Sequence, residues 1–275
     1  MRYMKLMRLF ATALLSMLIV RSSAQAPDTL ASVRLFMKVC NDYKRLPVQL
    51  DVDIRNTTNF VTGREDTGHH QARFCFQAGG SYVGYGDMEQ IADDSIVLLV
   101  SSRLRRMIIY RHRQPVTEQL QQYLGWQLQD SSVLRAVALY TFVQLPADKD
   151  TACMTMTSRR YVPHTGLPAE VMRIKYSTQG LNPFELIQEQ RRLIPVSATV
   201  YQGLAAQRGN EDRLLVIGDS SWYIIREQTT VYRYQHITHR EEDRLPVRIS
   251  DRIVADAPGR YRPVAAYAGF TLTRQ

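Results

Sequence analysis

The stretch Val48-Gln49-Leu50-Asp51-Val52-Asp53-Ile54-Arg55 alternates apolar and polar side chains without interruption. Successive side chains of a β-strand point to opposite faces, so this pattern predicts a half-buried strand over residues 48–54. It is the clearest periodic signal in the chain. A strand with one apolar and one polar face is typical of an antiparallel sheet that packs on one side only.

Many short stretches of the same kind follow. Phe74 and Phe76 alternate with polar neighbours, and Gly79-Gly80 predicts a hairpin turn into the next strand. Residues 134–145 fit either a helix or a buried strand, and the sequence leaves this open. The remaining strands are expected over residues 72–78, 81–85, 96–100, 104–111, 151–158, 170–176, 184–194, 214–217, 222–225 and 231–234.

Two helices are expected beside these strands. Apolar side chains recur every three or four residues from Leu30 to Tyr43, which predicts an amphipathic helix with Asp28 as its cap candidate. Val116–Leu124 is expected to form a short helical insert. One N-terminal helix, short helical inserts and many strands define an α+β protein with a mostly antiparallel sheet.

The first 24 residues have the features of a secretory signal peptide. Positive charges precede the twelve-residue apolar run from Leu9 to Val20, which is too short for an ordinary membrane span. Small residues then place the cleavage near Ala24. We therefore expect a periplasmic or secreted protein with one sheet-rich domain over residues 25–275, in contact with a membrane surface at most.

Composition and charge narrow the class further. The chain has 275 residues with 45% hydrophobic and 22% charged content, which excludes a disordered or fibrous protein. Its 35 basic and 26 acidic residues give a formal net charge of +9. Four of the basic residues lie in the signal peptide, so 31 remain against 26 acidic ones. That modest excess, on an exported chain, argues against a nucleic-acid partner.

The three cysteines do not form a disulfide-rich framework. An oxidising compartment would permit one disulfide among Cys40, Cys75 and Cys153, and the sequence does not decide whether any pair is bridged. We favour buried thiols, because Cys40 shares a helix face with apolar residues. None of the spacings suits zinc.

Several motifs resemble parts of catalytic sites, but none of them has the partner residues that catalysis requires. Gly218-Asp219-Ser220 after an apolar run resembles the nucleophile block of the GDSL hydrolases, yet no Asp precedes His236 or His239 by three positions. Without a base the Ser220 hydroxyl is a poor nucleophile, so a turn explains the block better. We expect no catalytic residues, no metal and no cofactor, and hence not an enzyme.

Arginines gather in one strand region. They bracket the apolar run Met107-Ile108-Ile109 and are candidates for binding anionic groups. Solvated strand ends are the alternative explanation. The cluster comprises Arg103, Arg105, Arg106, Arg111 and Arg113.

The order of these elements resembles the LolA/LolB-like periplasmic lipoprotein-carrier superfamily. A signal peptide, an amphipathic helix, an alternating strand, further hairpins and a helical insert succeed one another over roughly residues 28–200. The resemblance implies a strongly curved antiparallel sheet, an incomplete barrel, whose helices cover an apolar cavity for acyl chains. The chain from Glu211 onward extends beyond the minimal domain of that family.

The resemblance also implies a function. We expect an exported, non-enzymatic protein that binds a lipid or a lipidated partner, with the arginine cluster near head groups. The alternative is a ligand-free interaction component of a cell-envelope assembly, whose apolar residues form a packed core. The residues expected to line the cavity are Val52, Ile54, Phe74, Phe76, Met172 and Ile174.

Overall fold

A computed structural model of the chain describes most of its residues. The described residues are 29–41, 44–63, 66–111, 130–146, 148, 150–207, 209–218, 221–240, 245–257 and 259–274. The α-helices are α2 (Thr29–Asn41), α4 (Asp130–Leu139) and α5 (Ala198–Ala205). The strands are β1 (Val48–Thr58), β2 (Gly68–Gln77), β3 (Gly80–Tyr85), β4 (Met88–Asp93), β5 (Val97–Ser101), β6 (Arg106–Tyr110), β7 (Tyr140–Pro146), β8 (Thr151–Ser158), β9 (Glu170–Ser177), β10 (Pro183–Val196), β11 (Leu214–Ile217), β12 (Ser221–Thr238), β13 (Ile253–Ala257), β14 (Arg260–Pro263) and β15 (Thr271–Arg274).

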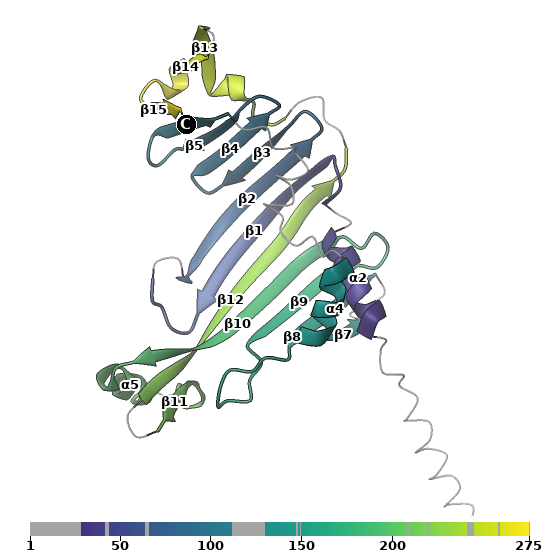
Figure 1. The fold of residues 1–275 in the computed structure, drawn as a ribbon, viewed down its shortest axis with the longest axis vertical. Coiled ribbons are helices and arrows are strands. Elements are labelled where there is room, and N and C mark those ends of the chain that lie inside the picture. Colours follow the sequence, from purple (N-terminus) through teal and green to yellow (C-terminus); the bar gives the residue numbers. More distant parts are fainter. Residues whose placement is uncertain are drawn as a thin grey trace, which may run out of the picture.

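One large sheet dominates the fold (Figure 1). Its order is β15-β6-β5-β4-β3-β2-β1-β12-β10-β9-β8-β7, with β11 added to β12. All pairs are antiparallel except β15 with β6, which are parallel. The predicted α+β class with a mostly antiparallel sheet and an N-terminal helix is confirmed.

The alternation in β1 defines two faces of this sheet. Directly paired residues of antiparallel strands lie on the same face, so the register extends each face from strand to strand. We call the face with Val48, Leu50, Val52 and Ile54 the front face, and the face with Gln49, Asp51, Asp53 and Arg55 the back face. The predicted strand is confirmed and continues four residues further, to Thr58.

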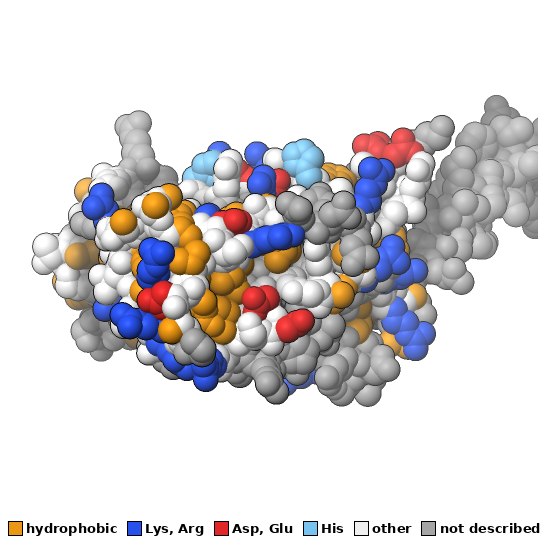
Figure 2. Space-filling model, turned by 90° about the horizontal axis from the view of Figure 1, so that it is seen from above, with side chains coloured by type: hydrophobic (Ala, Val, Ile, Leu, Met, Phe, Trp, Pro, Cys, Tyr) orange, Lys and Arg blue, Asp and Glu red, His pale blue; other side chains and the backbone are white. Residues whose placement is uncertain are grey.

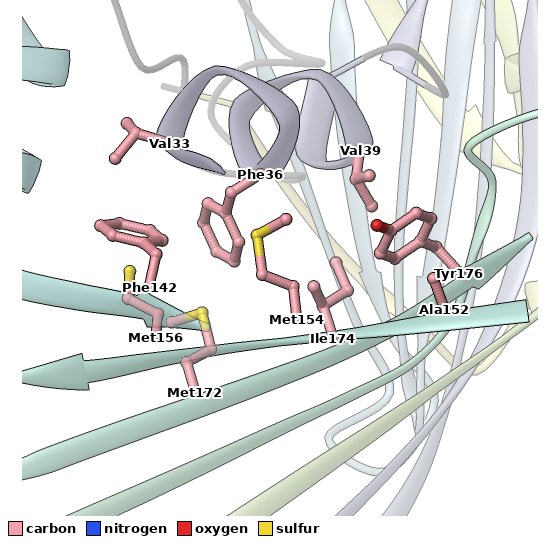
Figure 3. Packing of buried hydrophobic residues seen from close by; sticks show 10 residues of the cluster. All are labelled: Val33, Phe36, Val39, Phe142, Ala152, Met154, Met156, Met172, Ile174 and Tyr176. Atoms are coloured by element: carbon pink, nitrogen blue, oxygen red, sulfur yellow. The ribbon is translucent and has the colours of Figure 1, made fainter. Parts of the chain in front are cut away.

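Helices α2 and α4 cover one end of the front face. Phe36 of α2 points toward Met154 and Val39 lies beside Tyr176 on the sheet, and Phe36 meets Phe142 edge to face at 5.8 Å between ring centroids (Figure 3). We call this the helix-covered cluster. The amphipathic pattern predicted from Leu30 to Tyr43 therefore buries its apolar side against β7, β8 and β9, and the described helix ends at Asn41.

The C-terminal segment covers the other end of the sheet on the back face. Residues 245–274 place Ile253, Tyr261 and Phe270 against Leu98 and Met107 of β5 and β6. Two 3-10 helices and the β13–β14 hairpin belong to this segment, and β15 extends the sheet beyond β6 (Figure 1). No strand was predicted after residue 234, so this cover was not expected from the sequence.

Two segments are organised differently from the predictions. Residues 134–145 are not one element: α4 ends at Leu139 and β7 begins at Tyr140. The two strands predicted at 222–225 and 231–234 form one strand, β12, because pairing with β11, β10 or β1 continues from Ser221 to Gln235 and resumes at Thr238 after an irregularity. Together β10 and β12 extend past the rest of the sheet as a long arm that carries α5 and β11 (Figure 1).

Some predictions fall outside the described residues. These are the signal peptide with its cleavage near Ala24, the cap at Asp28, the helix at Val116–Leu124, and residues Arg113, Asp219 and Ser220.

Candidate functional site

The register brings all six predicted cavity residues onto the front face. Val52 pairs with Tyr234, and Ile54 pairs with Tyr232. Tyr232 pairs with Leu186, and Leu186 pairs with Ile174. Phe74 and Phe76 pair with Leu50 and Val48 of β1, and Met172 precedes Ile174 by two positions on β9. Residues far apart in sequence therefore share one continuous surface.

These residues nevertheless belong to two separate clusters. Met172 and Ile174 lie in the helix-covered cluster, whereas Val52, Phe74 and Phe76 lie in a cluster on β1, β2 and β3. Each of the five is at most 8% exposed. Only Ile54 is half-buried.

A half-buried apolar strip runs between the two clusters. It consists of Ile54 on β1, Tyr232 and Tyr234 on β12, and Leu186 on β10. Burial raises the pKa of the Tyr232 hydroxyl. We call these four residues the central strip; each of them is half-buried, whereas the clusters on either side consist of buried residues.

The front face becomes polar toward the end of the sheet that faces the arm. Along β10 its side chains run Leu186, Gln188, Gln190 and Arg192. Along β8 they run Met154, Met156 and Ser158, and Arg160 follows two residues later. Because β8 and β10 are both antiparallel to β9, the two series change in the same direction. On β10 this change from apolar to charged side chains, from Leu186 to Arg192, extends over about 20 Å at about 3.3 Å per residue.

A pocket of about 230 Å³ lies at this polar end. The Glu170 carboxylate is held there by two donors: the Tyr140 hydroxyl at 2.9 Å and the Gln188 amide at 2.8 Å. Burial, followed by the bond to Glu170, raises the pKa of Tyr140 to about 12. The pocket is lined by Leu139, Tyr140, Ser158, Arg160, Ala169, Glu170, Gln190, Arg191 and Arg192.

The back face of the central strands carries paired charges. Arg73 contacts Asp51 at 2.7 Å, and Lys175 contacts Glu185 at 2.7 Å. The Lys175 bond is the main cause of a lowered pKa at Glu185. A second pocket of about 340 Å³ lies beside Asp51 and Arg73. A third, of about 490 Å³, lies between the sheet and the C-terminal segment.

The predicted arginine cluster lies at the opposite edge of the sheet. Arg103 and Arg105 lie in the turn between β5 and β6, Arg106 begins β6, and Arg111 follows its end; all four are exposed. Arg103 lies 3.6 Å from Asp87, and Arg111 and Arg105 lie near Gly259 and Gly269 of the C-terminal segment. Seen from the C-terminal end, hydrophobic side chains form a band bordered by Lys and Arg (Figure 2). The role of these arginines at head groups stays a prediction.

The sequence motifs considered for chemistry are dispersed. His236, with a φ of 53°, lies 3.5 Å from Asp51, whereas the Nδ1 atom of His239 lies 3.0 Å from the Pro47 carbonyl oxygen. Within the described ranges no three His, Cys, Asp or Glu side chains are arranged to hold a metal ion.

The three cysteines lie on different elements and form no disulfide with one another. Cys40 belongs to α2, Cys75 to β2 and Cys153 to β8. Burial raises the pKa of the Cys40 thiol to about 12, so this group stays a neutral thiol at physiological pH.

Tyr140, Glu170, Arg160 and Arg192 were not among the site residues predicted from the sequence. A signal for them existed in the alternating series Leu186-Gln188-Gln190-Arg192, whose polarity changes along a single face. The partner series on β8 could be aligned with it only once the pairing through β9 was known.

No protein-family model and no curated protein sequence matches the chain. Similar solved structures include a LolA superfamily protein from Nitrosomonas europaea, 10% identical, with a TM-score of 0.24 over 78% of this chain and 94% of that protein. Another is a domain from Vibrio parahaemolyticus assigned to outer membrane lipoprotein sorting, 7% identical, with a TM-score of 0.20 over 75% of this chain and 91% of that domain. At TM-scores this low, two backbones coincide only in part. The fold and the site described above therefore follow from the strand pairing of this chain alone.

The chain is thus an α+β protein built on an open antiparallel sheet with helices on one face. The first of these similar structures is named as a LolA superfamily protein. The order of elements in the present sequence resembles the same superfamily. Among the described helices, none is both long enough and apolar enough to cross a lipid bilayer.

Proposed function

We propose that the protein is an exported, non-enzymatic carrier that binds an acyl chain of a lipid or lipidated partner on the front face. It acts in the periplasm, as a single domain over residues 25–275, after cleavage near Ala24. One observation carries the proposal: the apolar front face continues from one packed cluster to the other across the half-buried central strip.

Physical chemistry supports this use of the strip. A partly exposed apolar surface beside well-packed clusters gains free energy when a ligand removes it from water, at about 25 cal/mol per Å². An acyl chain is a long, narrow apolar ligand that suits such a strip. The predicted cavity residues Val52, Phe74, Met172 and Ile174 would form the packed walls on either side, while Ile54 and Leu186 touch the chain.

The test uses two adjacent residues of β10 that point to opposite faces. Leu186 and Ile187 are both half-buried, but Leu186 belongs to the central strip and Ile187 lies on the back face opposite Val231. We expect Leu186→Gln to weaken binding of a fluorescent long-chain fatty acid about tenfold or more, and Ile187→Gln to leave it unchanged. Both variants should be compared at equal folded fraction, judged by circular dichroism.

Lipid bound in the cell provides a second measurement. Protein exported in its native compartment should retain lipid that mass spectrometry detects after extraction. Repeated absence of lipid, together with no binding of the fluorescent fatty acid, would overturn the carrier proposal.

The second candidate function is a ligand-free interaction component of a cell-envelope assembly. It is favoured by the complete packing of both clusters, in which Phe76, Leu50 and Met154 are fully buried. Under this alternative Leu186→Gln changes binding of a partner protein and the fatty acid never binds.

A further inference from the structure

We propose that the pocket formed by Tyr140, Glu170, Arg160 and Arg192 binds the anionic head group of the ligand whose acyl chain lies on the central strip. This inference rests on the proposed function and adds to it the charge of the ligand and its direction on the sheet. The ligand is an amphiphile with a carboxylate or phosphate at one end, and its apolar tail points from Arg192 toward Leu186.

The direction in which the ligand lies on the sheet follows from the front-face side chains of β8 and β10. From Leu186 to Arg192 on β10, and from Met154 on β8 to Arg160 just after it, the side chains change from apolar through neutral polar to cationic toward the same end; beyond Arg192 the face of β10 is apolar again in the arm. An amphiphile has the same succession of chemistry, from tail to head. The opposite orientation would place a charged head group on Leu186 and Tyr232, where burial of an unpaired charge is costly.

Arg160 and Arg192 are the cations available to an anion in this pocket. Both line it and both are exposed. Among the described residues, neither has an acidic side chain within ion-pair distance. The third arginine of the pocket is already neutralised, because Arg191 contacts Glu227 at 2.7 Å and Glu189 at 3.0 Å on the back-face side.

The Glu170 carboxylate repels a bound anion less strongly than a carboxylate without hydrogen-bond donors would. One of its oxygens accepts a hydrogen bond from Tyr140 and the other from Gln188, and these two donors disperse part of its negative charge. The Tyr140 hydroxyl also lies within the electrostatic influence of Arg160. Tyr140 packs against the helix-covered cluster as well, so the pocket adjoins that cluster directly.

The other arginine-rich region lies too far away to hold the same head group. From β6 to β10 the sheet passes through seven strand pairs. At about 4.8 Å per pair, this is roughly 34 Å along the sheet. Arg103 and Arg105 therefore provide a matched control, since neutralising them removes the same charge from the same protein at a remote edge.

The experiment compares two fluorescent probes that differ only in charge. One is a long-chain fatty acid labelled near its methyl end, and the other is its methyl ester. We expect the full exported chain to bind the fatty acid about tenfold more tightly than the ester, because charge-assisted bonds to arginine are lost in the ester. The double variant Arg160→Gln/Arg192→Gln should remove this preference, and Arg103→Gln/Arg105→Gln should retain it.

Each outcome separates the inference from the function on which it rests. Equal binding of both probes, or an unchanged preference in Arg160→Gln/Arg192→Gln, overturns the head-group pocket and leaves the carrier proposal standing. Loss of preference only in Arg103→Gln/Arg105→Gln moves the head group to the other edge and also overturns it. Binding of neither probe overturns the carrier proposal and this inference together. Excess inorganic phosphate that displaces the fatty acid but not the ester supports an anion site, and displacement of both contradicts it.

Discussion

The two ends of the sheet are covered on opposite faces, and their sequences differ accordingly. At the β7–β9 end, helices α2 and α4 pack on the front face, so β8 alternates buried Met154 and Met156 with threonines on the uncovered back face. At the β3–β6 end, the C-terminal segment packs on the back face. There β5 and β6 are apolar on both sides: Leu98 and Ile109 face the segment, while Leu99 and Ile108 are half-buried on the front.

This difference shows how one sheet can be covered on a different face at each end. The end with the helices keeps its polar face in solvent, as an antiparallel sheet permits. The end with the C-terminal segment is closed on the back face by residues that follow the last long strand. The front face, shared by both ends, is the only one that remains apolar from β3 to β9.

The largest expected effect comes from removing the anchor of α2. Phe36 is 2% exposed and packs edge to face on Phe142. Truncation to Ala leaves a cavity in the helix-covered cluster, so Phe36→Ala should lower the free energy of unfolding by about 3–5 kcal/mol. Urea denaturation measures this, with Phe36→Leu as a control that should lose much less. A loss below about 1 kcal/mol would mean that α2 lies on the sheet as a loosely held cover rather than as part of the core.

A smaller effect is expected at the other cover. Arg252 of the C-terminal segment donates to both oxygens of Glu89 on β4, at 2.9 and 3.1 Å, and lies 4.9 Å from the Tyr267 ring centroid. Tyr82 donates to the same carboxylate at 3.2 Å. Arg252→Met leaves a half-buried Glu89 without its cation, which should cost about 2 kcal/mol of unfolding free energy.

The matched control for this pair is the double variant Glu89→Gln/Arg252→Met. Because it removes both charges, it should be more stable than Arg252→Met alone. If the two variants are equally stable in urea, the ion pair does not hold the C-terminal segment to the sheet, and the apolar contacts of Ile253 and Phe270 do so without it.

The smallest effect concerns the boundary between the two ends, at the base of the arm. Asp66 accepts bonds from the Thr62 and Gly63 backbone amides and contacts Arg226 of β12. The Thr62 bonds lower the pKa of Asp66 to about 2, from an ordinary value of 3.8. The stabilisation from this carboxylate is complete above about pH 4 and is lost as the pH falls toward 2.

The measurement is the urea midpoint between pH 5 and pH 2.5. We expect the midpoint of the parent protein to fall over this range, and Asp66→Asn to show a shallower fall from a lower starting value. Parallel curves would show that Asp66 does not contribute to the acid sensitivity of the protein.

Much of the sheet could be predicted from local patterns. The strands at 48–54, 151–158 and 214–217 were predicted because alternation or β-branched content is a property of consecutive residues. Short segments of mixed polarity were harder to predict as strands. Met88-Glu89-Gln90-Ile91 of β4 has no clear period, and this segment forms a strand because β3 and β5 pair with it on both sides. The same reason joins 222–225 and 231–234 into one strand.

The candidate site could be predicted only in part. The six apolar residues were chosen for alternation, and the register places all of them on one face. The head-group prediction used arginines that are close in sequence. Arg160 and Arg192, which share one pocket, are 32 positions apart, and no local pattern relates them.

The sequence by itself determined the class of the protein: that most of its segments are strands, that the N-terminal helix is amphipathic, and that β1 has an apolar and a polar face. These follow from the periods of 2 and 3.6 residues, which neighbouring side chains impose on the backbone. Only the tertiary structure decided which strands are adjacent, which face of the sheet is covered at each end, and where arginines lie close to the central strip. Pairing register and packing are interactions between distant parts of the chain, and their energies depend on all partners at once.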